Sequence, residues 1–478
     1  MALTFYWHDY ETWGADPRKD RVAQFAGIRT DEALNIVGKP LVCYCKPADD
    51  FLPQPEACLI TGLTPQKALR EGVVEADFFR FIHAEMSKPG TCGVGFNSVR
   101  FDDEFTRFGL FRNFFDPYAR EWQNGNSRWD IIDMVRLTHA LRPEGIVWPK
   151  REDGATSFRL EELSAANGIA HEMAHDALSD VYATIEMARL IRQHQPRLFE
   201  YLLALRNKRK VAELLNLREW QPVLHVSSMY PAENGCIAMV VPIARHPTNP
   251  NGVIVYDLRA DPEPLIELPE TEIQSRLFTP RAQLAEGVTR IPLKTVHLNK
   301  CPVVVPMNTL TEQAVERWGI NTELGWRHIE ALKKATGLVE KVEAVHQSRE
   351  FDPITDPDQS LYSGDFFSKD DRKRMDQVLT ATPESLAGMS MAFDDARLPE
   401  MLFRYRARNW PEFLSADERA RWQEYRFDRL TNPEGGASIT LTAYRQQLAK
   451  LMVDASINPV GKQVLSELAD WPGEIGLD

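Results

Sequence analysis

The sequence predicts an α/β domain with a mixed sheet, followed by a β-rich domain and an α-helical C-terminal domain. Residues 1 to about 190 alternate strand-like and helix-like stretches, with three strands before the first helix. After about residue 216, short strand-like runs are punctuated by prolines and asparagines, and after residue 357 the pattern is helical. A chain of 478 residues is too long for one compact core, so two or three domains are expected.

The N-terminal region opens with three runs of β-forming residues, at 3–11, 22–28 and 40–45. Two helices, a strand, a short helix and a long helix are predicted after them, at residues 65–70, 76–86, 91–96, 158–163 and about 177–193. Asp176 is the predicted N-cap of the long helix, because an aspartate before an apolar helical repeat can accept hydrogen bonds from the first turn.

The middle region contains recurring short strands, at residues 223–227, 237–241, 252–257 and 295–299. Short strands separated by turn residues are typical of a small β-barrel or sandwich. In the C-terminal region, Ser415 and Glu418 have the spacing of a capping box ahead of a helix that contains Trp422.

The composition is that of an ordinary globular protein, with 43% hydrophobic and 26% charged residues. No apolar run is long enough to span a bilayer, and the first residues lack the basic segment of a secretory signal. The six cysteines are scattered and form no CxxC pair, which favours free thiols in a reducing compartment. We therefore expect a cytoplasmic protein without membrane association.

The formal net charge of −13 argues against nucleic acid as a partner, because DNA-binding domains are usually basic. Two effects weaken this objection. Catalytic carboxylates add negative charge that bound cations neutralise, and basic residues can gather on one face of an acidic protein. Net charge alone therefore does not exclude a nuclease.

Asp9 and Glu11 lie two residues apart in the first strand-like run. Alternate residues of a strand share a face, so the two carboxylates project the same way and repel each other unless a cation lies between them. Oxygen ligands suit Mg²⁺ or Mn²⁺. An exposed acidic strand end would look the same, so this pair is a weak signal by itself.

Two further segments carry candidate residues. Asp102 follows a glycine-containing strand and begins an apparent helix, where the role of N-cap is the simpler interpretation. Asp180 lies at the edge of the inward face of the long helix, where an unpaired carboxylate is costly. His175 lies just before that helix, in a position to reach a substrate, although surface histidines near helix starts are common.

The order of these residues is more informative than any one of them. Asp9 and Glu11, then Asp102, then His175 and Asp180 resemble the motifs of the DEDDh exonucleases in the ribonuclease H-like superfamily. Thr12–Gly14 after the first motif and Asn97 before Asp102 also fit the DEDDh pattern. Further segments resemble the bacterial exonuclease I family over nearly the whole chain: Asn124–Asp130, Leu141–Gly145, Ser157–Glu161, Leu298–Pro302 and Leu402–Asn409.

This resemblance implies a ribonuclease H-like nuclease domain at residues 1–192, a Src-homology-3-like barrel domain at 196–347 and a helical C-terminal domain at 351–478. It implies hydrolysis with two Mg²⁺ ions, for which Mn²⁺ can substitute, held by Asp9, Glu11, Asp102 and Asp180. His175 would be the general base, since the pKa of histidine suits proton transfer near neutral pH.

A single strand is bound by cations along its backbone and by aromatic rings under its bases. The candidate DNA contacts, besides Glu11, are Arg107, Tyr118, Trp122, Arg128, Arg136, Arg159, Lys208 and Lys300. Arg159 could equally form an exposed helix salt bridge, and the basic run around Lys208 could be a solvated face. Gly62, in the loop at residues 60–65, would let the backbone approach the terminal nucleotide.

The resemblance implies a processive 3′→5′ exodeoxyribonuclease that degrades single-stranded DNA to 5′-mononucleotides. It also implies a role in DNA repair and recombination, docking to the acidic tail of single-strand-binding protein, and a bacterial, cytoplasmic monomer. Two alternatives stay open: a DEDDh ribonuclease that trims RNA 3′ ends, and an inactive strand-binding protein. We expect deletion of residues 350–478 to make digestion distributive.

Overall fold

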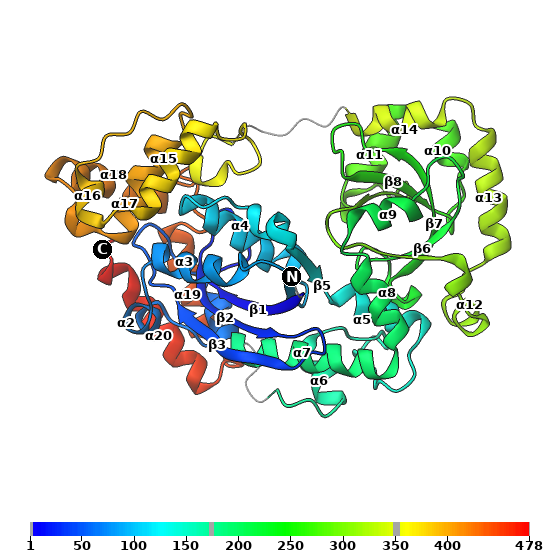
Figure 1. Ribbon diagram of the computed structural model, residues 1–478, viewed down its shortest axis with the longest axis horizontal. Helices are drawn as coiled ribbons and strands as arrows, with labels where there is room; N and C mark the ends of the chain where they lie inside the picture. The colour runs from blue at the N-terminus through cyan, green and yellow to red at the C-terminus, as the bar shows by residue number, and fades with distance from the viewer. Residues whose placement is uncertain (1–2, 172–175, 348–353, 478) are drawn as a thin grey trace. The chain divides into compact units, whose positions relative to one another are not determined.

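The computed structural model describes residues 3–171, 176–347 and 354–477. The chain forms two compact units, and Figure 1 shows its elements coloured along the sequence. The first unit comprises Met1–Ser127, His171–Ile185 and Asp352–Asp478, and the second comprises Arg128–Ala170 and Glu186–Phe351. The N-terminal and C-terminal regions therefore belong to one unit.

The first unit is built on a mixed sheet with the strand order β3-β2-β1-β4. β1 (Thr4–Thr12) is antiparallel to β2 (Val22–Thr30) and parallel to β4 (Thr91–Gly95), and β2 is antiparallel to β3 (Ile36–Tyr44). The mixed sheet confirms the sequence prediction. β3 begins four residues before the predicted strand, because it is an edge strand and can include Pro40.

Helices pack on this sheet through a core of aromatic residues. The helices of the N-terminal region are α1 (Pro55–Thr61), α2 (Pro65–Glu71), α3 (Glu75–Met86) and α4 (Asp102–Arg112). Phe25 of β2, Phe78 and Phe79 of α3, and Phe105 of α4 are buried in one cluster. α7 (Ala177–His194) begins in this unit, and its start agrees with the predicted helix.

The C-terminal helices share a hydrophobic core with the N-terminal region. Trp13, Phe51 and Leu52 pack in one buried cluster with Tyr444 and Trp471. These helices are α15 (Lys369–Thr380), α16 (Pro383–Ala387), α17 (Leu398–Asn409), α18 (Ala416–Thr431), α19 (Leu441–Met452) and α20 (Pro459–Glu474). The capping box predicted at Ser415 and Glu418 is formed at the start of α18.

Buried ion pairs add to this shared core. The guanidinium of Arg408, on α17, donates to the carboxylates of Asp50 and Asp358 at 2.8 and 2.6 Å, and all three side chains are buried. Although burial alone would raise it, Arg408 and Arg21 hold the pKa of Asp50 below its usual range. Without Arg408, Asp50 would keep Arg21 at 3.8 Å and Asp358 would keep Arg404 at 3.1 Å, so the buried negative charge would be only partly compensated.

The second unit contains a five-stranded antiparallel sheet with the order β10-β6-β7-β8-β9. Its strands are β6 (Val223–Val226), β7 (Ile237–Arg245), β8 (Gly252–Asp257), β9 (Leu293–His297) and β10 (Val303–Pro306). The four predicted strands match β6 to β9, and the sequence prediction missed β10. β5 (Ser127–Asp130) begins where the chain enters this unit.

The helices of the second unit lie before, between and after these strands. They are α5 (Ile132–Leu141), α6 (Leu160–Ala166), α8 (Pro196–Ala204), α9 (Lys208–Leu214), α10 (Glu263–Glu267), α11 (Glu270–Phe278), α12 (Glu312–Trp318), α13 (Thr322–Lys334) and α14 (Leu338–Gln347). Among the residues described, no helix has the length and apolar character needed to cross a membrane.

Candidate active site

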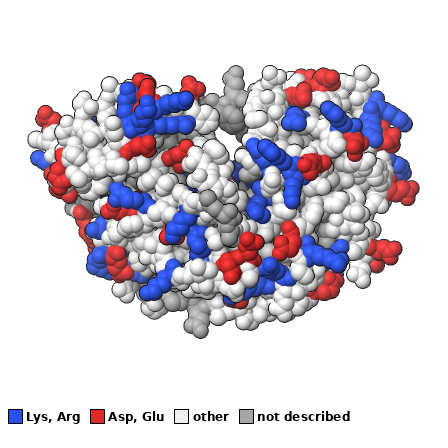
Figure 2. Space-filling model, in the orientation of Figure 1, with Lys and Arg blue, Asp and Glu red and all other residues white. Residues whose placement is uncertain are grey.

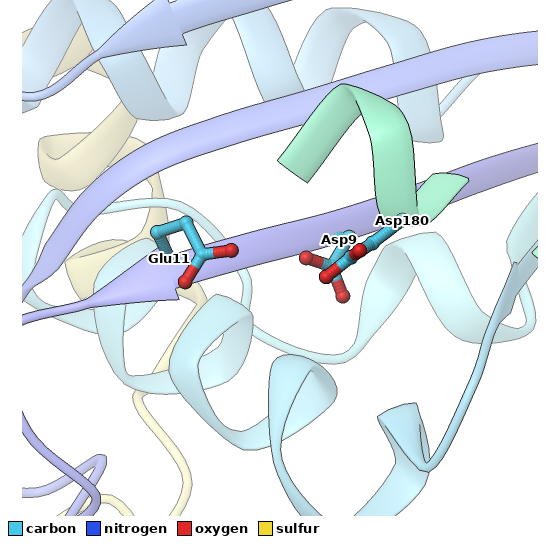
Figure 3. Close-up of side chains that lie close together, drawn as sticks. All are labelled: Asp9, Glu11 and Asp180. Carbon is cyan, nitrogen blue, oxygen red and sulfur yellow. The ribbon is translucent and has the colours of Figure 1, made fainter. Parts of the chain in front are cut away.

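Three carboxylates meet where β1 passes the first turn of α7. Carboxylate oxygens of Asp9, Glu11 and Asp180 lie within 4.8 Å of one another. Figure 3 shows Asp9 and Glu11 projecting from β1, with Asp180 approaching from the helix. The alternation of the strand places the first two on one face, and the helix start supplies the third.

Asp102 joins this group from the start of α4. Its carboxylate accepts a hydrogen bond from the backbone N–H of Tyr10, which lies between Asp9 and Glu11, at 3.1 Å. Phe101 is the N-cap of α4, so the N-cap interpretation of Asp102 is wrong. Asn97 precedes this helix in the left-handed region at φ 64°, which asparagine adopts more readily than most residues.

Burial and mutual repulsion oppose ionisation of the Asp9 and Glu11 carboxyl groups. Burial, followed by the charges of Asp180 and Asp102, raises the pKa of Glu11 to about 9. Burial and the charges of Asp102, Asp180 and Glu11 also raise the pKa of Asp9 well above its ordinary value. A divalent cation would compensate these charges, and carboxylate oxygens are the ligands that hard cations prefer. The residues therefore fit a metal centre.

Two residues near α7 extend this description. Asp176 is the N-cap predicted from the sequence, and its carboxylate accepts a hydrogen bond from the N–H of Ser179 at 3.3 Å. The Nε2 atom of His171 is hydrogen-bonded to the carboxylate of Asp180, a contact that no sequence pattern indicated. His175, the predicted general base, lies outside the described residues.

A cavity of about 580 Å³ adjoins Glu11 and is also lined by Thr61 of α1 and Ser438, among others. Ser438 belongs to the C-terminal region, and its hydroxyl donates to the carboxylate of Asp20. Gly62 ends α1 with φ 68°, a left-handed conformation that favours glycine. No local pattern could have placed Ser438 in this cavity, because 418 residues separate it from Asp20.

The predicted DNA contacts in the first unit differ in their surroundings. Arg107 is buried and forms a two-bond ion pair with Glu121, at 2.7 and 2.8 Å. Its guanidinium also lies over the ring of Tyr118, at 5.4 Å from the ring centre. Trp122 has 66% of its surface exposed. Trp122 is therefore accessible to a nucleic acid base, whereas Arg107 is already neutralised.

The predicted contacts in the second unit divide in the same way. Arg128 and Arg136 are buried, and they donate to the carbonyl of Asn299 at 2.9 Å and to Asp133 at 2.5 Å. Lys208, Lys300 and Arg159 are more accessible. Lys208 donates to the side chain of Asn251 at 3.0 Å. The side chain of Arg159 is 71% exposed, and its guanidinium lies 3.9 Å from the carboxylates of Glu161 and Glu162. Figure 2 shows basic side chains among acidic ones on the face drawn.

Comparison with known proteins assigns the family. Three family models match successive parts of the chain: "Exonuclease" at residues 6–188, "Exonuclease I SH3-like domain" at 206–348 and "Exonuclease I C-terminal domain" at 355–475. Exodeoxyribonuclease I of Escherichia coli K12 is 49% identical over 473 residues, which cover 99% of this chain and 98% of the relative. The chain belongs to the exonuclease I family. A Haemophilus influenzae member is 42% identical and covers 95% of each chain.

Solved structures of the family have the same fold. Exonuclease I of Methylocaldum szegediense matches with a TM-score of 0.95 and 52% identity over all of both chains. E. coli exonuclease I in complex with a dA16 oligonucleotide matches with a TM-score of 0.95 and 46% identity, over 99% of this chain and 100% of the other. A zinc-bound form of the E. coli complex with single-stranded DNA matches with a TM-score of 0.93 and 45% identity, over 99% of each chain. The predicted nuclease, Src-homology-3-like and helical parts are confirmed.

Proposed function

We propose that this chain is a 3′→5′ exodeoxyribonuclease that degrades single-stranded DNA and releases 5′-mononucleotides. The observation that carries the proposal is the meeting of Asp9, Glu11 and Asp180, with Asp102 hydrogen-bonded to the backbone between the first two, in a chain that matches exodeoxyribonucleases along nearly its whole length. The full-length match disfavours a minimal RNA trimmer. The four carboxylates disfavour an inactive strand-binding protein.

Asp9, Glu11, Asp102 and Asp180 would hold two divalent ions, Mg²⁺ in the first place, with Mn²⁺ able to substitute. Such ions, when bound, supply positive charge to the phosphate and lower the pKa of water. The raised pKa values of Asp9 and Glu11 support this assignment, because bound cations would compensate the buried and mutually repelling charges that cause them. His175 would accept the proton of the attacking water.

The cavity lined by Glu11 would receive the terminal nucleotide, since Glu11 belongs to the carboxylate group that would act on the last phosphodiester. The exposed Trp122 would stack under a base of the strand, and Arg159, Lys208 and Lys300 would contact phosphates. Arg107, Tyr118, Arg128 and Arg136 would support these contacts from positions that are already hydrogen-bonded or packed.

Several wider properties belong to the same proposal. The enzyme would act processively as a bacterial, cytoplasmic monomer in DNA repair and recombination. It would dock the acidic tail of single-strand-binding protein. Their support is the family membership of the chain.

The test is digestion of 5′-labelled single-stranded DNA, and of RNA of the same sequence, with Mg²⁺ and with EDTA. We expect ladders that shorten from the 3′ end of DNA only, 5′-mononucleotide products, and no reaction in EDTA. Asp180→Ala should lower turnover by more than about 100-fold with DNA binding retained, since even changes to residues that only orient metal ligands cost about 10–100-fold. Near-normal turnover of Asp180→Ala with Mg²⁺, or equal digestion of RNA, would overturn the proposal.

A further inference from the structure

Gln24, on β2, lies directly opposite Glu11 on the neighbouring strand β1. The register of the antiparallel pair places Glu11 opposite Gln24 and Asp9 opposite Ala26. Directly opposed residues of paired strands share a face, so the Gln24 side chain lies on the face that carries the catalytic carboxylates. Only 2% of its surface is exposed. A buried amide requires hydrogen-bond partners, and two of those of Gln24 lie at the start of α7.

The amide of Gln24 contacts two consecutive residues of that helix start. Its Nε2 group donates to the carboxylate of Asp176 at 3.1 Å, and its Oε1 atom accepts from the backbone N–H of Ala177 at 3.4 Å. Asp176 in turn caps the helix through the N–H of Ser179. The side chain of Gln24, on β2, therefore holds both the N-cap residue Asp176 and the backbone N–H of Ala177, the first residue of α7.

This attachment bears directly on the metal centre. Asp180 lies one turn into α7, and its backbone N–H donates to the carbonyl of Asp176 at 3.1 Å. The position of the Asp180 carboxylate relative to Asp9 and Glu11 thus depends on where the helix start is held. We propose that Gln24 is a positioning residue, which sets the distance between Asp180 and the two carboxylates of β1.

The chemistry of an amide suits this position better than that of other side chains. The Asp176 carboxylate needs a donor and the Ala177 N–H needs an acceptor, and an amide supplies both within one group. A glutamate would direct a second negative charge at the carboxylate of Asp176, which the Gln24 amide now contacts as a donor. A methionine would fill the same volume and leave two buried polar groups without these contacts.

The inference rests on the proposed metal-dependent hydrolysis, so the test measures metal binding separately from activity. Mn²⁺ binding to the full chain is measured by isothermal titration calorimetry for the wild type, Gln24→Met and Gln24→Glu. Thermal melting in EDTA is measured on the same samples. The matched control is Tyr44→Phe, because the Tyr44 hydroxyl accepts the third hydrogen bond of the Gln24 amide, at 3.3 Å, and is not part of the helix.

We expect both Gln24 variants to bind Mn²⁺ roughly 10- to 100-fold more weakly, the range for residues that orient metal ligands. Their kcat on single-stranded DNA should fall, while KM stays within about twofold because the DNA contacts are unchanged. Tyr44→Phe should resemble the wild type in all three measurements. Gln24→Asn, which keeps the amide but is one methylene shorter, should recover part of the Mn²⁺ affinity.

Unchanged Mn²⁺ affinity in folded Gln24→Met and Gln24→Glu would overturn the positioning role. An equal loss in Tyr44→Phe would also overturn it, since the effect would then come from the general packing of β2. A lower melting temperature with normal Mn²⁺ affinity would assign Gln24 to stability alone. If the wild type bound no Mn²⁺ and digested no DNA, the proposed function itself would fail.

Discussion

Glu11 shows how a single residue links the stability of the fold to its chemistry. Its pKa rises from an ordinary value of 4.5 to about 9 through burial and neighbouring carboxylates. The folded protein therefore binds this proton more tightly than the unfolded chain does. The contribution to stability is fully present below about pH 4.5 and is lost as the pH rises toward 9. Near neutral pH, the metal-free site opposes folding.

Glu11→Gln should accordingly stabilise the metal-free protein at pH 8 and leave it unchanged at pH 4. We expect the melting temperature in EDTA to rise at pH 8 by roughly 2–4 °C, the effect of about 1 kcal/mol in a domain of 150–250 residues. Calorimetry of this variant and of Glu384→Gln, at an exposed position on α16, checks this. A gain that is equal at both pH values would contradict the charge-repulsion account.

The role of the Trp122 side chain in binding single-stranded DNA can be tested by substitution. Its exposed ring can stack with a base, and such stacking contributes about 1–3 kcal/mol. Trp122→Ala should weaken binding of single-stranded DNA roughly 5- to 100-fold without lowering the melting temperature. Arg107→Met should mainly lower the melting temperature, with a smaller loss of DNA affinity, because its guanidinium pairs with Glu121 in the interior. Fluorescence anisotropy and thermal melting separate the two effects. Normal DNA affinity in Trp122→Ala would remove Trp122 from the binding site.

At the scale of elements, α17 is attached to the N-terminal region by buried charge. Arg408→Met would leave the carboxylates of Asp50 and Asp358 without this partner, at a cost of about 3–5 kcal/mol. Urea unfolding measures the loss. Lys373→Met, which removes an exposed ion pair with Asp370 on α15, should leave the unfolding midpoint unchanged. Equal midpoints for both variants would show that the buried pairs do not stabilise the fold.

The elements that could be predicted from the sequence are those whose signals are local. β1, α4 and α7 follow from strand composition, helical periodicity and an N-cap, and the order of their acidic residues indicated the site. The partners of these elements could not be predicted in the same way. Gln24 and Asp176 are 152 residues apart, and Arg408 and Asp50 are 358 residues apart. Residue type also did not show that Arg107 is neutralised by Glu121.

At the scale of the whole molecule, the C-terminal helices are part of the unit that carries the active site. Tyr444, Leu465 and Trp471 complete the core around Trp13 and Phe51. Deleting residues 350–478 would expose this core, so the expectation of a folded, distributive enzyme is replaced. The truncated chain should be insoluble or partly unfolded, as judged by circular dichroism and size-exclusion chromatography. A folded, monomeric and active fragment would contradict the shared core.

Asp9 and Glu11 of β1, Asp102 of α4 and Asp180 of α7 are proposed to form one metal centre. A crystal structure of the protein soaked with Mn²⁺, with anomalous scattering recorded at the manganese edge, tests it most directly. We predict anomalous peaks within coordination distance of the carboxylate oxygens of Asp9, Glu11, Asp102 and Asp180. Manganese bound elsewhere, with these four carboxylates free of metal, would contradict the claim.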